Sequence, residues 1–407
     1  MPVTVVVGAQ WGDEGKAKVI DLLAKEHTHV VRYQGGHNAG HTVVVGSERY
    51  ALQLVPSGVL YPHIIPVIAN GVVIDLPTLF HEIDTLEGRG VSCAKLIVSS
   101  QAHLIFPWHQ ALDALYEASR GDARIGTTLK GIGPAYADKA LREGVRAGEV
   151  LDAGRFRAAV KERAVSHNTE IVALGGQALD VDELVERFAA YGQRLAPYVA
   201  DTVAILHEAL DRDDRLLLEG AQATFLDLDH GTYPFVTSSN PTAGGACVGT
   251  GIGPRYLSRI VGISKAYTTR VGSGPFPTEL HDEVGDQLVE IGHEFGTVTG
   301  RRRRTGWLDC VMLRKAVRIN SLTELALTKL DVLDTFPEIK VCTEYDADGR
   351  PVYAVLDGWQ CDISAVRNQA DLPAKAAAFV ALVESEVGVP VRIVGTGPSR
   401  EAVLEWQ

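Results

Sequence analysis

Short apolar runs rich in β-branched residues alternate with amphipathic segments along most of the chain. The runs predict strands at residues 3–7, 29–33, 65–69, 95–98, 215–218, 260–266, 324–328 and 391–394. The amphipathic segments predict helices at 19–24, 76–86, 108–118, 156–165, 181–191 and 202–210. Strands that alternate with helices in this way favour a large, mainly parallel central sheet flanked by helices on both faces. The expected fold class is therefore α/β.

Two segments depart from this alternation. Residues 43–45 and 50–54 flank the turn-like sequence 46–48 and predict a hairpin insertion. Residues 154–210 are rich in helical patterns and predict a helix-rich insertion over the sheet. No repeat, low-complexity tract or Pro/Ser-rich linker interrupts the sequence, so we expect one large α/β domain, residues 1–407, with subdomains.

Composition narrows the class of protein without naming a ligand. Of 407 residues, 46% are hydrophobic and 22% are charged, which excludes a wholly disordered or fibrous chain. The formal charge of −12 gives no global reason to bind nucleic acid or an anionic membrane, so neither is an expected partner. Five cysteines without CxxC spacing indicate neither a disulfide framework nor a zinc site, and a cytoplasmic location is expected. The apolar run at 3–7 lacks a preceding basic segment, so no targeting segment is predicted there.

The loop between the first strand and the first helix has the composition of a phosphate-binding loop. Its glycines let backbone N–H groups approach phosphate oxygens, and the helix N-terminus and a lysine favour an anion. It is not a standard P-loop, because six residues instead of four separate Gly8 from Gly15, and Ala17 replaces the usual serine or threonine. Asp13 and Glu14 would repel a phosphate unless they hold a metal or move a proton. The loop is therefore a candidate for phosphate binding and for catalysis.

A second glycine-rich loop, 34–42, follows the second predicted strand. His37 and His41 have the i, i+4 spacing of a zinc pair on a helix, but three glycines in the segment oppose a helix. A loop histidine can act as a general acid, and glycine carbonyls can reach a hard cation. The alternative is a histidine that only stabilises the loop through hydrogen bonds.

Four consecutive arginines, 301–304, stand out in a chain of net negative charge. Such a run is usually a solvated face or a nucleic-acid patch. Here glycines bracket the run and no aromatic residue interleaves it. A loop that closes on phosphates and carboxylates is the favoured interpretation.

The predicted strand 324–328 ends in the sequence Thr-Lys-x-Asp. Asp331 can accept hydrogen bonds from N1–H and the exocyclic amino group of guanine, while the stem of Lys329 packs along the base. Adenine cannot supply that pair of donors. Together with the phosphate-binding loop, the motif predicts a site that reads guanine.

Taken in order along the chain, these segments resemble the adenylosuccinate synthetase family. Further blocks at 125–128, 131–136, 219–222, 229–234, 236–240 and 274–278 also look like that family's, so the resemblance covers essentially the whole chain. It implies a P-loop-like nucleotide-binding fold and a Mg²⁺-dependent ligase that joins inosine monophosphate (IMP) to L-aspartate while GTP becomes GDP and phosphate. It also implies a 6-phosphoryl-IMP intermediate, a role in AMP biosynthesis and a homodimer.

The resemblance assigns roles residue by residue. The implied catalytic residues are Asp13, the base that removes the purine N1 proton, and His41, the acid that supports the 6-oxygen, together with Lys16 and Gln222. The implied Mg²⁺ ligands are Asp13 and the carbonyl of Gly40.

The implied ligand contacts form three sets. Those to GTP are Gly12, Glu14, Gly15, Lys16, Ala17, Lys18, Gly40, His41, Thr42, Arg304, Lys329, Leu330, Asp331, Gly395, Thr396 and Gly397. Those to IMP are Asp13, Asn38, Ala39, Thr128, Gln222, Thr237, Arg302 and, from a second subunit, Arg142. Those to aspartate are Val298, Thr299, Gly300, Arg301 and Arg302.

Three positions depart from the family's pattern. Ala17 and Ala223 replace glycines, and Gly395 stands where a serine is often found. If the φ of Ala17 is positive, its methyl group costs stability, whereas at a helix start alanine fits well.

Two other functions compete with this interpretation. One is a sibling ligase that uses a guanine nucleotide as the acceptor; Asp13 argues against it, because that branch lacks the aspartate base. The other is a guanine-nucleotide switch or binding module, which gives the 38–41 loop and the four arginines no evident role.

Overall fold

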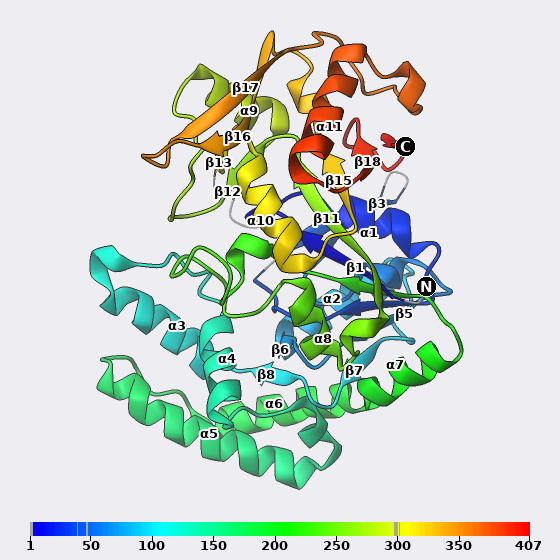
Figure 1. The fold of residues 1–407 in the computed structure, drawn as a ribbon. Helices are drawn as coiled ribbons and strands as arrows, with labels where there is room; N and C mark the ends of the chain where they lie inside the picture. The colour runs from blue at the N-terminus through cyan, green and yellow to red at the C-terminus, as the bar shows by residue number, and fades with distance from the viewer. Residues whose placement is uncertain (1–2, 39, 46–47, 297–299, 301) are drawn as a thin grey trace.

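A ten-stranded sheet forms the centre of the molecule (Figure 1). The structure is a computed structural model that describes residues 3–38, 40–45, 48–296, 300 and 302–407. The strand order is β19-β18-β15-β11-β1-β10-β2-β5-β7-β9, and each neighbouring pair is parallel except β18–β19. The strands are β1 (Val3–Gly8), β2 (His29–Arg32), β5 (Ile65–Ile68), β7 (Ile97–Ser99), β9 (Val199–Ala200), β10 (Leu216–Glu219), β11 (Leu257–Lys265), β15 (Glu324–Thr328), β18 (Val391–Gly395) and β19 (Val403–Glu405).

Helices and four smaller sheets surround the central sheet. The α-helices are α1 (Lys16–Ala24), α2 (Leu76–Gly88), α3 (Pro107–Ser119), α4 (Ile132–Leu141), α5 (Ala153–Ala173), α6 (Val181–Leu195), α7 (Thr202–Asp211), α8 (Ala243–Thr250), α9 (Glu283–Gly292), α10 (Cys310–Asn320) and α11 (Ala374–Val387). The smaller sheets pair β3 (His41–Val45) with β4 (Glu48–Leu52), β6 (Val73–Asp75) with β8 (His103–Ile105), β12 (Thr268–Arg270) with β13 (Arg304–Gly306), and β14 (Leu308–Asp309) with β16 (Glu338–Tyr345) and β17 (Pro351–Asp357). No helix within the described ranges is long and apolar enough to cross a membrane.

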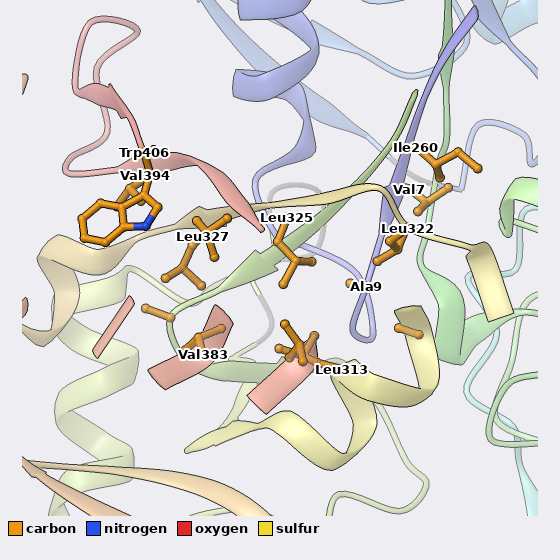
Figure 2. Close-up of a cluster of buried hydrophobic side chains, with 14 of the residues drawn as sticks. Val7, Ala9, Ile260, Leu313, Leu322, Leu325, Leu327, Val383, Val394 and Trp406 are labelled. Atoms are coloured by element: carbon orange, nitrogen blue, oxygen red, sulfur yellow. The ribbon is translucent and has the colours of Figure 1, made fainter. Parts of the chain in front are cut away.

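The central sheet is buried on both faces, as its continuous apolar strands require. On one face, Leu327 of β15 belongs to the same core cluster as Leu313 of α10 and Val383 of α11 (Figure 2). On the other face, Ala326 of β15 joins a cluster that contains Ile20 of α1. Truncating a side chain such as Leu327 to alanine would leave a cavity and cost about 2–5 kcal/mol.

The structure confirms the predicted α/β class and most predicted elements. Strand β15 has the predicted bounds, and the hairpin insertion is β3–β4. The second loop was predicted to run through Thr42, but His41 and Thr42 already pair in β3, so that prediction was two residues too long. The segment 154–210 is mostly helical, with β9 at the edge of the sheet; its status as an insertion within a single domain stays a prediction.

Candidate functional site

The candidate site lies at the carboxyl ends of the parallel strands, where ligands of open α/β sheets bind. The predicted phosphate-binding loop, which we call the phosphate loop, joins β1 to α1. The predicted guanine-side residues follow β15 and β18 on one side of β1, and the predicted IMP-side residues follow β2 and β10 on the other. The strand order therefore places the phosphate loop between the two predicted nucleotide sites.

The phosphate loop is shaped by left-handed backbone and by a buried carboxylate. Gly12, Asp13 and Gly15 have φ of 95°, 59° and 85°. The fully buried Glu14 turns inward: its Oε1 accepts from the backbone N–H of Gly12 at 2.7 Å, and its Oε2 lies 2.6 Å from Nζ of Lys16. Helix α1 begins at Lys16 with no side-chain cap; the N–H of Lys18 donates to the carbonyl of Gly15 at 3.2 Å, and a helix N-terminus without a side-chain cap favours an anion.

Two of the three departures from the family pattern, Ala17 and Ala223, fit the backbone. Ala17 lies within helix α1, where alanine is favourable, and Ala223 has an extended φ of −162°. The loop after β10 packs closely against Gly8 at the end of β1. A Cβ atom added at Gly8 would lie 2.7 Å from Cβ of Ala223 and 2.8 Å from the carbonyl oxygen of Gln222, so this position requires glycine.

Two of the predicted IMP residues are in contact. Gln222 has a φ of 56°. Its Nε2 donates to Oδ1 of Asn38 at 3.2 Å, and Nε2 of Gln34 donates to Oε1 of Gln222 at 2.9 Å. Thr128 is exposed in the segment before α4, and the backbone N–H of Thr237 donates to Leu226. Among the described residues, no hydrogen bond joins either threonine to the Gln222–Asn38 pair.

The predicted guanine side contains, among its described residues, an unpaired acceptor. Asp331 lies in the short 3₁₀ helix Leu330–Leu333. Its Oδ1 is buried without a hydrogen-bond partner in the described structure. Burial raises the pKa of its carboxyl above the usual range. A buried acceptor without a donor is costly, so this atom is suited to receive a ligand N–H.

The neighbouring lysines are held in place rather than free. Lys329 has a φ of 58°, and its Nζ lies 2.7 Å from both the carbonyl oxygen of Gly292 and Oε1 of Glu294. Nζ of Lys18 donates to the carbonyls of Gly397 and Ala402, each at 2.7 Å. Lys18 thus fixes the loop that follows β18, and burial lowers its pKa to about 8.

The described arginines of the 301–304 run point to different partners. Arg302 forms an exposed ion pair with Asp286. Arg303 is buried and lies with its Nε 2.7 Å from Oδ2 of Asp13. Arg304 begins β13; its Nε lies 2.6 Å from Oε1 of Glu279, and its Nη1 lies 2.9 Å from the carbonyl oxygen of Gly274.

Some predicted positions have no structural description. Ala39, Val298, Thr299 and Arg301 lie outside the described residues, and the side chains of His41 and Thr42 are likewise not described. Gly300 has a φ of 63°, and Gly40 directly precedes β3.

Arg142 differs from the other predicted IMP residues in its position. It caps the C-terminus of α4 with a φ of 68°, and its side chain is exposed. Among the described residues of its own chain, no ion pair joins Arg142 to an acid. Its guanidinium is therefore accessible from outside the chain.

A buried cluster away from the site has the residue types of a metal centre. His109, Asp138 and His167 are the only described group of at least three metal-capable side chains gathered in this way. However, Nδ1 of His109 accepts from the backbone N–H of Phe106 at 3.0 Å, and its Nε2 lies 3.0 Å both from Nε1 of Trp108 and from Oδ2 of Asp138, so both ring nitrogens already have protein partners. The cluster is a hydrogen-bonded contact between α3, α4 and α5.

Sequence reasoning missed three buried charges of the site. Lys265 and Glu294 are fully buried, and Arg303 is buried beside them. The arginine run was noticed, but nothing in it distinguishes the arginine that turns inward. Glu294 follows the end of helix α9, where no periodic pattern of apolar residues indicates which side chains are buried.

A glycine-rich loop lies between the buried carboxylate of Asp331 and the amide pair Gln222–Asn38, at the carboxyl ends of a parallel sheet. This arrangement is typical of P-loop-like, nucleotide-dependent enzymes. Comparison with known proteins gives the family: the model for adenylosuccinate synthetase matches residues 5–404. The adenylosuccinate synthetase of Frankia alni is 53% identical, with 99% of each chain covered. A solved structure of the fully ligated adenylosuccinate synthetase from Plasmodium falciparum superposes with a TM-score of 0.95 at 37% identity and covers 100% of both chains. The chain belongs to the adenylosuccinate synthetase family.

The family fixes the activity. The protein is a GTP-dependent ligase that joins IMP to aspartate in purine biosynthesis. The succinoaminodeoxyadenylate synthetase of cyanophage S-2L has a TM-score of 0.64 and 20% identity to this chain, covering 99% of it and 95% of the phage protein, which shows a shared fold alone. The sibling and switch alternatives are not favoured.

Proposed function

We propose that the loops after β1, β2, β10, β15 and β18 perform the ligation through a 6-phosphoryl-IMP intermediate. The observation that carries the proposal is the position of Asp13, whose loop lies between the loops of the two nucleotide sites. Its side chain is 39% exposed, so a ligand can reach it, and it already pairs with a cation. A base at this place can act on one nucleotide while the other supplies the phosphoryl group.

The chemistry that these residues would support has two steps. Asp13 takes the N1 proton of IMP, the 6-oxygen forms a bond to the γ-phosphorus of GTP, and the bond from that phosphorus to the GDP oxygen breaks. The neutral amine nitrogen of aspartate then forms a bond to C6 and loses a proton to solvent, and the C6–O bond breaks to release phosphate. His41 would support the 6-oxygen as an acid, and Lys16 would stabilise charge on the transferring group.

The three substrates would occupy separate surfaces of the site. GTP would use the N–H groups of the phosphate loop, Arg304, the segment 329–331 and the loop 395–397. IMP would use the Gln222–Asn38 pair, Thr128 and Thr237. Aspartate would use the segment 298–302, with Arg302 also near the ribose of IMP.

The residues around Asp13 fit Mg²⁺. The Asp13 carboxylate belongs to the phosphate loop and already lies 2.7 Å from a cationic group, Nε of Arg303. Mg²⁺ usually takes only one or two protein carboxylates together with phosphate oxygens and waters. Asp13 and the carbonyl of Gly40 would hold the ion. When bound, it neutralises charge on the phosphates.

We also propose a homodimer in which Arg142 reaches the IMP phosphate of the partner subunit. The exposed position of Arg142 at the end of α4 supports this assignment. A guanidinium is well suited to bidentate phosphate binding.

One assay tests the proposed function. Phosphate release from GTP is measured with IMP, aspartate and Mg²⁺ present, and then with each omitted in turn. We expect release to require all three. Release that continues at the full rate without IMP would contradict the mechanism and favour a simple GTPase.

A further inference from the structure

Glu294 occupies an unusual place for a carboxylate. Helix α9 ends at Gly292, His293 turns the chain with a φ of 50°, and the backbone N–H of Glu294 donates to Val289 at 2.9 Å. This turn sends the Glu294 side chain inward, where it is fully buried. An ionised group without solvent must be paired by the protein.

Three cations and a hydroxyl surround this one carboxylate. Its Oε1 lies 2.8 Å from Nζ of Lys265 and 2.7 Å from Nζ of Lys329, and it also accepts from the hydroxyl of Tyr267. Its Oε2 lies 2.7 Å from Nη1 of Arg303. Burial alone would raise the pKa of Glu294, but the two ammonium groups outweigh it and hold that pKa well below the usual range.

The partners connect two parts of the site that are far apart in sequence. Lys329 belongs to the segment proposed to read guanine, two residues before Asp331. Arg303 pairs with Glu294 through Nη1, and its Nε lies 2.7 Å from Oδ2 of Asp13. Counting Asp13, the cluster has one more positive than negative charge, which favours an incoming phosphate.

We propose that Glu294 is a positioning residue that couples the guanine-reading segment to the Asp13 carboxylate. This inference rests on the proposed function. It fixes Lys329 and Arg303 at once, so a displacement of either segment is transmitted to the other. Its loss should therefore impair both the use of GTP and the phosphoryl-transfer step, while the Gln222–Asn38 pair on the other side of β1 is not affected.

The test is steady-state kinetics of Glu294→Gln, with the active fraction determined by nucleotide titration. We expect kcat to fall at least about tenfold and KM for GTP to rise about tenfold, with KM for IMP within about twofold of the wild type. A purely structural role predicts fewer active molecules with unchanged KM values. The matched control is Glu324→Gln, because Glu324 lies at the far end of β15 and pairs with Arg259 at 2.6 Å; its constants should stay at the wild-type values.

Breaking a buried ion pair can prevent folding, so a second variant is included. Glu294→Gln/Lys265→Met removes one buried charge of each sign and should show the same rise in KM for GTP. Wild-type constants in either folded variant would overturn the proposal, and so would failure of both to fold, since Glu294 would then serve folding alone. A wild type that releases phosphate without IMP would instead contradict the proposed function together with this inference.

Discussion

Arg303 forms an ion pair with Asp13, with Nε of the arginine 2.7 Å from Oδ2 of the aspartate. The contact places a guanidinium at the carboxylate proposed to act as the base. Because the same guanidinium also pairs with Glu294, Asp13 is linked to a carboxylate outside the phosphate loop.

Asp13→Ala should lower kcat by at least about 100-fold, because the variant loses the base for the N1 proton. The measurement is the rate of adenylosuccinate formation at saturating substrates. Asp286→Ala, which removes an exposed carboxylate near the arginines, serves as the control and should remain close to wild type. Activity of the Asp13 variant within a few-fold of wild type would remove Asp13 from the mechanism.

Asp331→Asn should weaken the use of GTP and improve the use of xanthosine triphosphate. The buried Oδ1 of Asp331 lacks a donor in the described structure, and guanine would supply one. The new amide can instead donate to the 2-oxo group of xanthine. Ratios of kcat/KM for the two nucleotides measure the change, and equal use of ATP and GTP by the wild type would refute guanine reading at this position.

Arg302→Leu should chiefly raise KM for aspartate, by roughly tenfold, since the variant removes a cation from the proposed aspartate segment. In this structure Arg302 pairs with Asp286 on the surface. Asp286→Asn keeps the arginine and breaks only the pair, so its KM for aspartate should change by less than about twofold. Equal effects of the two substitutions would show that the ion pair, not the arginine, matters.

Mixing two inactive variants tests the shared site. Asp13→Ala and Arg142→Leu chains that exchange subunits form about half mixed dimers, and each mixed dimer regains one of its two sites, so about one quarter of the wild-type activity should return. If subunit exchange is demonstrated and no activity returns, Arg142 acts within its own chain.

Glu82 should make stability depend on pH. Its carboxylate accepts from the backbone N–H groups of Gln53, Leu54 and Val55, just after the β3–β4 hairpin, yet burial raises its pKa to about 6 from 4.5. A raised folded-state pKa means that the folded protein binds the proton more tightly. This contribution to stability is complete below about pH 4.5 and is lost as the pH rises through about 6.

The measurement is the free energy of unfolding of wild type and Glu82→Gln across this range. Their difference should shift by about 2 kcal/mol against the wild type as the pH rises. A difference that does not vary between pH 4 and 7 would contradict the assignment.

The sequence predicts the elements with strong local signals and misses those defined by partners. Strand β15 and its Thr-Lys-x-Asp end were predicted because an apolar run and a polar stop are adjacent in sequence. The hairpin β16–β17 was missed because its strands alternate weakly and are partly exposed, as the exposed Val352 and Val355 show. The inward turn of Glu14, and the burial of Glu294, depend on contacts that a sequence pattern does not encode.

The strand order also separates two kinds of specificity. The proposed donor of the phosphoryl group is recognised after β15 and β18, whereas the proposed acceptor is recognised after β2 and β10, with β1 between them. Substitutions that alter the choice of donor can therefore accumulate on one side of β1 without disturbing the acceptor pocket. A fold arranged in this way can exchange its energy source during evolution while it retains the purine on which it acts.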